Sequence, residues 1–173
     1  ELTELEYSLY AQVTDYVREG MNRADRVGGK RKNTVGFALT VLQRRLASSP
    51  EAIYRSLVRR TERLERKKLE ILNGTYTDTE PTIDFEGLDA DDYNSEQIEE
   101  LEEELLDAAT AAQTVEELDA EILELAELTT VAKQVRDSGT DRKWTELSRI
   151  LQDEALTVDA NGWPRKLIIF TEH

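Results

Sequence analysis

The spacing of apolar residues along the chain is that of amphipathic helices. In the first part of the chain, apolar side chains recur at intervals of three and four residues. Three such stretches predict helices over about residues 3–25, 35–47 and 50–73. Helix-start patterns support two of these limits, because Thr3 is followed by Glu6 as in a capping box, and Ser49 precedes a proline. Between the first two helices, residues 26–33 contain two adjacent glycines and predict a flexible turn.

The second part of the chain repeats the helical pattern after an acidic loop. Residues 75–94 show no periodicity, and their acidic residues lack the glycine and the final glutamate of a calcium-binding loop. Ser95 predicts the start of the next helix, and Thr114 with Glu117 predicts another capping box. The predicted seam of the helix that follows, which is mostly apolar, has heptad spacing, which is typical of a coiled coil. They are Val115, Leu118, Ile122, Leu125, Thr129, Ala132 and Arg136.

Charge and sequence distance predict which two helices pair. We expect residues 49–73 and 114–136 to lie antiparallel, held by their apolar seam and flanked by ion pairs. The basic face of the first helix would then meet the glutamates of the second, which are Glu116, Glu117, Glu121, Glu124 and Glu127.

The end of the chain has a different pattern. A short helix is expected from about residue 140 to 152, with Trp144, Leu147, Ile150 and Leu151 facing inward. Four consecutive apolar residues, 167–170, then read as a strand buried on both faces, as in the centre of a parallel sheet. Because no other stretch predicts a strand, we expect the chain to be a piece of a larger protein that ends as its next domain begins.

The predicted class is therefore all-α, an elongated helical bundle with a long antiparallel coiled-coil-like hairpin and one unpaired carboxyl-terminal strand. Five regions follow from the pattern: a basic helical region, an acidic loop, an acidic helical hairpin arm, a short helix with a turn, and the first strand of a further domain. Their limits are residues 1–74, 75–94, 95–138, 139–165 and 166–173.

Composition removes several classes of function. The 173 residues include no cysteine, so neither a disulfide nor a thiolate metal site is available. No run of 18 apolar residues and no signal-peptide pattern is present, so we expect a cytoplasmic protein without membrane contact. No phosphate-binding glycine loop is found, and the single histidine, His173, is a poor candidate for a catalytic base. We therefore expect no catalytic residue, no metal site and no cofactor-binding residue.

The net charge of −15 conceals two halves of opposite sign. Residues 1–68 carry 15 Lys and Arg against 9 Asp and Glu, a net +6, and residues 69–173 carry 7 against 28, a net −21. Clustered basic residues are the usual contacts to nucleic-acid phosphates, although here they also balance the acidic half or are simply solvated. The candidate nucleic-acid contacts are Lys30, Arg31, Lys32, Arg44, Arg45, Arg55, Arg59, Arg60 and Arg63.

Several phrases resemble the Swi/Snf-type ATP-dependent helicases of superfamily two. Residues 2–10 and 13–17 (LTELEYSLY and VTDYV) resemble the segment that leaves the first RecA-like lobe. Residues 42–52 (LQRRLASSPEA), with LVRR at 57–60, resemble the helical region between the lobes of bacterial members. Residues 143–147 (KWTEL) and 165–173 (RKLIIFTEH) resemble the approach to the second lobe and its first strand.

This resemblance implies a non-catalytic inter-lobe segment of a DNA translocase, acting as a spacer and as a lever that contacts duplex DNA. ATP and Mg²⁺ would bind the parent protein, whose catalytic motifs lie outside these residues, and the two RecA-like lobes would be the intramolecular partners. An alternative function is an acidic coiled-coil module that recruits a protein partner. As an isolated chain, we expect residues 166–171 to pair with a second copy, because an exposed apolar strand promotes association.

Overall fold

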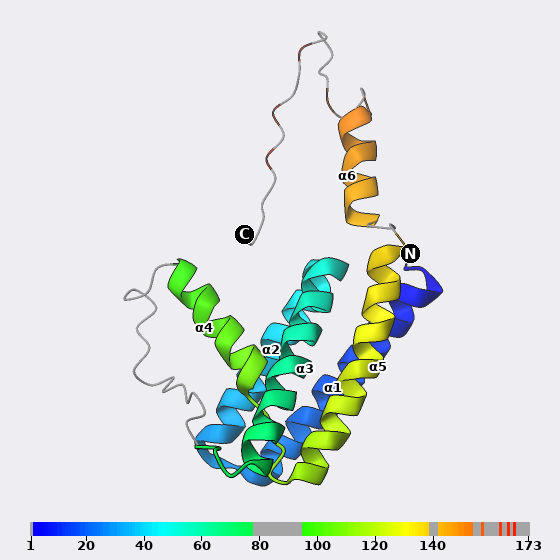
Figure 1. The fold of residues 1–173 in the computed structure, drawn as a ribbon. Coiled ribbons are helices and arrows are strands. Elements are labelled where there is room, and N and C mark those ends of the chain that lie inside the picture. Colours follow the sequence, from blue (N-terminus) through cyan, green and yellow to red (C-terminus); the bar gives the residue numbers. More distant parts are fainter. Residues whose placement is uncertain are drawn as a thin grey trace. The chain divides into compact units, whose positions relative to one another are not determined.

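The structure is a computed structural model that describes residues 2–77, 95–138 and 142–153, together with Thr157, Trp163, Lys166 and Ile168. These residues form six helices and no strand, so the all-α class is confirmed for the described part of the chain (Figure 1). The chain divides into two compact units, residues 1–138 and 139–173. The helices are α1 (Glu4–Val27), α2 (Gly29–Ser48), α3 (Pro50–Leu72), α4 (Ser95–Ala108), α5 (Val115–Asp137) and α6 (Arg142–Gln152).

Both predicted capping boxes are present. The Thr3 hydroxyl accepts the Glu6 N–H at 3.2 Å, and the Thr3 N–H donates to Glu6 Oε2 at 2.7 Å. Thr114 and Glu117 make the same reciprocal pair at the start of α5. Each box satisfies backbone N–H groups that the first turn of a helix leaves without partners, which is why both helices begin where the sequence predicts.

The turn predicted over residues 26–33 is present at its two glycines, but its predicted extent is wrong. α1 continues to Val27, and α2 already begins at Gly29. The reversal of the chain is concentrated at Gly28 and Gly29, whose φ values of 70° and 62° suit glycine and strain other residues. The basic residues that follow extend the amino-terminal end of α2 instead of forming a loop.

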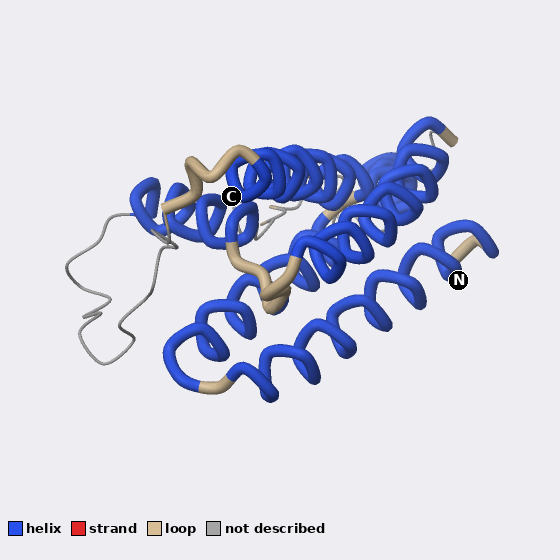
Figure 2. Tube along the Cα trace, turned by 60° about the horizontal axis from the view of Figure 1, so that its bottom comes forward, coloured by secondary structure: helices blue, strands red, loops and turns tan. Residues whose placement is uncertain are grey.

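Four helices of the first unit close into a ring. α1 packs on α2, α2 on α3, α3 on α5, and α5 back on α1, with successive members running in opposite directions (Figures 1 and 2). α4 lies outside this ring against α2 and α3. The core between the helices is made of aliphatic side chains with little or no exposed surface, among them Val13, Leu42, Leu57 and Leu125.

α3 and α5 lie antiparallel, as their contacts show. Glu51 near the start of α3 pairs with Arg136 near the end of α5, and Lys68 near the end of α3 pairs with Asp119 near the start of α5. Arg136 also lies over the Tyr54 ring, with its guanidinium carbon 4.0 Å from the ring centre. A coiled-coil geometry of this pair stays a prediction.

The buried face of α5 is rotated relative to the predicted seam. Positions 118, 125 and 132 are buried as expected, but 122 and 129 are only partly buried. The second row of the seam consists instead of Glu121, Leu128 and Val135, because α5 packs on α1 as well as on α3. A glutamate therefore occupies a core position.

The second unit contains α6, a short amphipathic helix. Leu147 and Ile150 are half-buried, whereas Leu151, which was expected to face inward, is exposed. The predicted strand of residues 166–173 lies outside the described residues except for Lys166 and Ile168, which belong to no helix or strand. Most of the predicted acidic loop, from residue 78 onward, also lies outside them.

Candidate functional site

The candidate cations at the start of α2 lie near the surface. Lys30 and Lys32 are exposed and Arg31 is half-buried. Lys32 Nζ lies 3.0 Å from Asp25 Oδ1 of α1, in an exposed pair that contributes little to stability. This end of the bundle therefore presents cations within a single helical turn.

A second group of candidates faces the acidic helix α4. Arg44 is paired with Glu102, and Arg45 Nη2 lies 3.7 Å from Glu99 and 3.8 Å from Glu103. Arg59 of α3 contacts the same helix, since its Nη2 is 3.1 Å from Glu103 and its Nε donates to Asp107 Oδ2 at 3.2 Å. α4 thus covers arginines from two helices at once.

The remaining candidates are divided between surface and interior. Arg55 is exposed and forms an ion pair of 2.5 Å with Glu51 one turn earlier in α3. Arg63, two turns after Arg55, is half-buried. Arg60 is 1% exposed and lies inside the bundle, where no DNA phosphate reaches it in this arrangement. The nine candidates therefore do not form one continuous surface.

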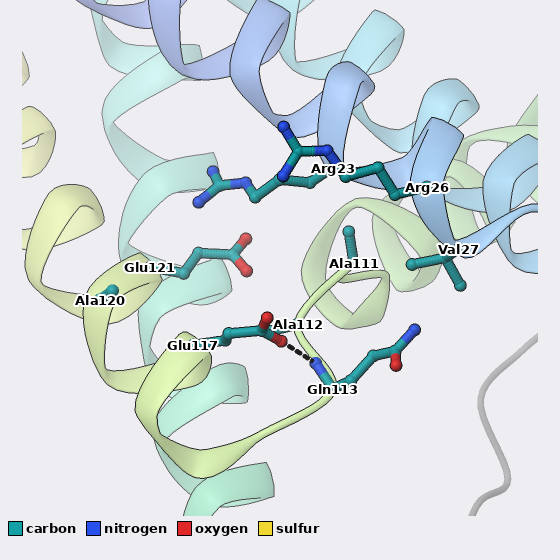
Figure 3. A pocket seen from close by; sticks show the side chains of 9 residues that line it. All are labelled: Arg23, Arg26, Val27, Ala111, Ala112, Gln113, Glu117, Ala120 and Glu121. Atoms are coloured by element: carbon teal, nitrogen blue, oxygen red, sulfur yellow. Dashed lines mark hydrogen bonds between the residues drawn. The ribbon is translucent and has the colours of Figure 1, made fainter.

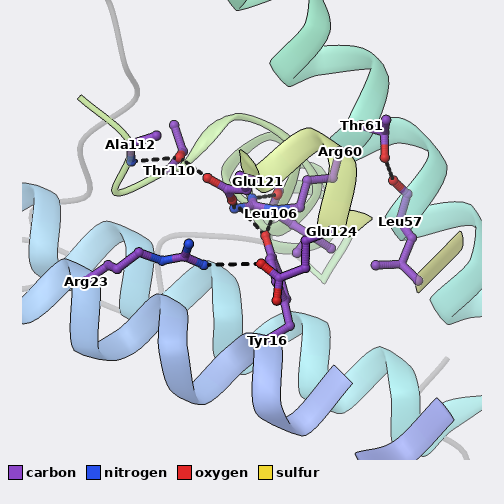
Figure 4. Close-up of polar contacts among 10 residues, drawn as sticks. All are labelled: Tyr16, Arg23, Leu57, Arg60, Thr61, Leu106, Thr110, Ala112, Glu121 and Glu124. Atoms are coloured by element: carbon purple, nitrogen blue, oxygen red, sulfur yellow. Dashed lines mark hydrogen bonds and ion pairs between the residues drawn. The ribbon is translucent and has the colours of Figure 1, made fainter. Parts of the chain in front are cut away.

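Arg60 is the centre of a buried polar junction (Figure 4). Its Nη2 donates to Glu121 Oε1 at 2.8 Å, its Nε to the Tyr16 hydroxyl at 2.8 Å, and its Nη1 to the Leu106 carbonyl at 2.6 Å. The Tyr16 hydroxyl donates in turn to Glu121 Oε1 at 2.7 Å, and Thr110 donates to Glu121 Oε2 at 2.5 Å. The junction connects α1, α3, α5, the end of α4 and the link between α4 and α5.

The ionisation of the junction follows from its geometry. Burial alone raises the pKa of the Glu121 carboxyl, but the adjacent Arg60 charge and the hydrogen bonds from Thr110, Tyr16 and Arg60 lower it overall. Burial raises the pKa of the Tyr16 hydroxyl, which therefore stays protonated and donates. Burial opposes the charge on Arg60, yet Tyr16 and Glu121 raise the pKa of its guanidinium. Arg60 and Glu121 are therefore both ionised near neutral pH, and each compensates for the buried charge of the other.

Sequence reasoning missed this junction, although a signal was present. The buried apolar residues of α3 skip from Leu57 to Leu64, and those of α5 skip from Leu118 to Leu125, because Ile122 is only partly buried. Arg60 and Glu121 occupy the seam positions inside these two gaps. Residues of opposite charge at the missing core positions of two paired helices indicate a buried ion pair.

A pocket of about 310 Å³ lies beside the junction (Figure 3). Arg23 and Arg26 of α1 line one side, and Glu117 and Glu121 of α5 line the other. Arg23 lies 3.6 Å from Glu124, and Glu117 accepts the Gln113 N–H at 2.7 Å. These charges largely balance within the protein, so the pocket resembles a solvated groove more than an ion-binding site.

Within the described residues, no group of three or more His, Cys, Asp or Glu side chains is arranged to hold a metal ion. Among the helices that the structure describes, none has the length and apolar character needed to cross a membrane.

No known family model matches the chain, and neither a curated protein nor a solved structure does. Function is therefore inferred from the residues themselves.

Proposed function

We propose that residues 1–138 form a non-catalytic, rigid helical module that separates and couples the two RecA-like lobes of a Swi/Snf-type ATP-dependent DNA helicase. The observation that carries this proposal is the buried junction of Arg60 with Tyr16 and Glu121. It joins helices that are far apart in the sequence. The family itself is proposed from the resemblance of residues 2–10, 13–17, 42–52, 57–60, 143–147 and 165–173.

A lever between two motor lobes has to transmit motion without bending. Aliphatic packing alone tolerates sliding between helices, whereas a buried ion pair with several hydrogen bonds is satisfied in one arrangement only. Loss of any one of these contacts leaves a charge or hydroxyl buried without a partner. The junction therefore favours rigid-body movement of the whole bundle over deformation inside it.

Duplex DNA is the proposed external partner of the basic half. Lys30 and Lys32 at the start of α2, together with Arg55 and Arg63 of α3, are exposed or half-buried candidates outside the ion pairs described with α4, and the half-buried Arg31 lies between the two lysines. Contacts of this kind bind phosphates without reading bases, so the expected affinity is weak and falls steeply with salt. ATP and Mg²⁺ belong to the proposed parent protein, and no residue of this chain is assigned to hydrolysis.

The test of DNA contact is an anisotropy titration of the whole chain with a labelled duplex in low salt. We expect a dissociation constant of roughly 10⁻⁴ to 10⁻⁶ M at physiological salt and tighter binding in low salt, with several-fold weaker binding for Lys30→Gln/Arg31→Gln/Lys32→Gln. The matched control is Arg18→Gln/Arg66→Gln/Lys133→Gln, which changes the net charge equally at exposed sites. Equal weakening in both variants, or no binding at low salt, contradicts the assigned contact.

The test of the lever uses a protein that carries both lobes. Arg60→Met should leave DNA-stimulated ATP hydrolysis largely intact while reducing translocation, because a softened bundle no longer transmits lobe closure. If hydrolysis and translocation fall in proportion, or neither changes in a folded variant, the lever role is wrong.

One observation favours a second function, an acidic module that recruits a protein partner. Leu123 of α5 is 65% exposed and lies one turn from both Asp119 and Glu127, so an apolar residue is flanked by acidic ones on one stripe. A basic protein surface with an apolar centre is the complementary partner. Leu123→Lys should abolish that association and leave the duplex titration unchanged.

A further inference from the structure

α4 is an acidic helix that lies against arginines of two neighbouring helices, α2 and α3. It contains seven Asp and Glu residues and no Lys or Arg. Its carboxylates at positions 99, 102, 103 and 107 contact Arg44 and Arg45 near the end of α2 and Arg59 near the middle of α3. These three arginines are named here the arginine face, and the Arg44 side chain remains 42% exposed beside α4.

The fit between α4 and the arginine face is incomplete. Arg45 is about nine-tenths buried, yet its Nε and Nη2 atoms have no hydrogen-bond partner, and the carboxylates near it are 3.7 and 3.8 Å away. Asp107 Oδ1 is likewise buried without a partner. Because buried polar groups are normally satisfied, such a contact is poorly optimised as a permanent interface.

The two ends of α4 are held differently. At its carboxyl-terminal end, Leu105 and Leu106 are completely buried, and the Leu106 carbonyl accepts a hydrogen bond from Arg60 of the junction. Toward its amino-terminal end, Glu99, Glu102 and Glu103 form ion pairs with Arg44 and Arg45 of α2, and Leu101 is only half-buried. The carboxyl-terminal end of α4 is therefore anchored by complete apolar burial, whereas the part before it is held by ion pairs and by partial burial of Leu101.

We propose that residues 95–104 of α4 are a displaceable acidic cover, which occupies the arginine face in place of DNA phosphates. This inference rests on the proposed DNA contact of the basic half and adds its regulation. When a duplex binds, its phosphates replace the α4 carboxylates on Arg44, Arg45 and Arg59, while Leu105 and Leu106 stay buried. Arg59 lies one turn from the exposed Arg55 on α3, so the uncovered face extends a surface that is already accessible.

The cover is tested by removing its charge without shortening the helix. Glu99→Gln/Glu102→Gln/Glu103→Gln neutralises the carboxylates of residues 95–104 that contact the arginine face and leaves Asp107 unchanged. The matched control, Glu100→Gln/Glu104→Gln/Glu116→Gln, changes the net charge equally at exposed positions of α4 and α5. Both variants and the unaltered chain are titrated with the same labelled duplex over a range of salt concentrations.

We expect the cover variant to bind at least about tenfold more tightly than the control. Without the three carboxylates, a larger fraction of the protein has an uncovered arginine face, so less free energy of binding is lost in displacing α4. Its dependence on log salt should steepen by about 0.9 for each arginine that becomes available. If the two variants bind DNA equally tightly, the proposed role of α4 as a cover is wrong, while the proposed DNA contact is retained. If neither variant nor the unaltered chain binds, the DNA contact fails and the cover fails with it.

Hydrogen exchange on the unaltered chain gives a second readout that needs no variant to fold. Saturating duplex should speed amide exchange in residues 95–104 and leave residues 105–108 protected. Unchanged or slower exchange in residues 95–104 with DNA bound contradicts displacement.

Discussion

Arg60 and Glu121, 61 residues apart in the chain, form an ion pair of 2.8 Å with side chains only 1% and 6% exposed. Both ions lose their hydration on folding, so the pair is tolerated only because Tyr16, Thr110 and the Leu106 carbonyl complete its hydrogen bonds. The helices that carry these groups cannot shift without breaking one of those bonds. Three predictions about stability follow from this relationship or from the helix ends around it.

Glu121→Gln should lower the free energy of unfolding by about 3 kcal/mol at neutral pH, because Arg60 is left buried without a counter-charge. The pKa of Glu121 is lowered in the folded state, so its stabilisation is present above the ordinary carboxyl pKa of about 4.3 and is lost as the pH falls through the lowered value. The difference between the two proteins should therefore shrink in acid. Urea unfolding at several pH values measures it.

The control for this prediction is Glu116→Gln, at an exposed position of α5, which should change stability by less than about 0.5 kcal/mol. Asp107 and Glu124 have raised pKa values, chiefly through burial, and their contribution has the opposite pH dependence. Because Asp107 and Glu124 are present in every protein measured, their contributions cancel when the free energies of unfolding are compared at the same pH. A difference that grows in acid would show that Glu121 is not the ionised partner of Arg60.

Arg60→Met and Glu121→Leu should be strongly non-additive. Each single change strands a buried charge and should cost about 3–5 kcal/mol, whereas the double variant removes both charges together. We expect a coupling energy of at least about 2 kcal/mol in a double-mutant cycle measured by urea unfolding. Costs that simply add would mean that the two side chains do not interact.

Thr114→Ala should lower the free energy of unfolding by about 1 kcal/mol, because the first turn of α5 loses its side-chain cap. Thr130→Ala in the same helix is the control, since that exposed hydroxyl bonds only to the Ala126 carbonyl one turn back. Thermal unfolding compares the two. Equal effects would indicate that the capping box contributes nothing to the limits of α5.

Removal of residues 166–173 should abolish self-association of the isolated chain. Ile168 is 74% exposed, and an apolar segment in water favours pairing with a second copy. Light scattering over a range of concentrations should show mass increasing for the complete chain and constant mass for the shortened one. A complete chain that stays monomeric at every concentration rules out pairing through this segment.

The parts of the fold that depend on local rules were predictable. The capping boxes at Thr3 and Thr114 and the proline start of α3 depend on residues within one turn, and all three are confirmed. The start of α2 was not predicted, because basic residues after two glycines resemble a loop when their helical neighbours are unknown, whereas its end at Ser48 agrees with the predicted limit. The chain reverses its direction within only two positions, Gly28 and Gly29.

The candidate site was less predictable, because exposure is a property of packing between helices. Arg59 and Arg60 are adjacent and chemically identical, yet one faces α4 at the surface and the other is buried against Tyr16. From the sequence alone, Arg59 and Arg60 are equally good candidates for contacts to phosphates. The distinction depends on the rotation of α3 about its axis, which is set by its packing on α2, α4 and α5 together.

Native-state hydrogen exchange tests the rigidity of the bundle most directly. If the junction makes residues 1–138 one unit, buried amides near Val13, Leu57, Leu106 and Leu125 should all exchange with a single opening free energy, equal to that of global unfolding. Distinct and lower opening energies for α1, or for α5, would show helices that move separately, and a lever built from them would not transmit force.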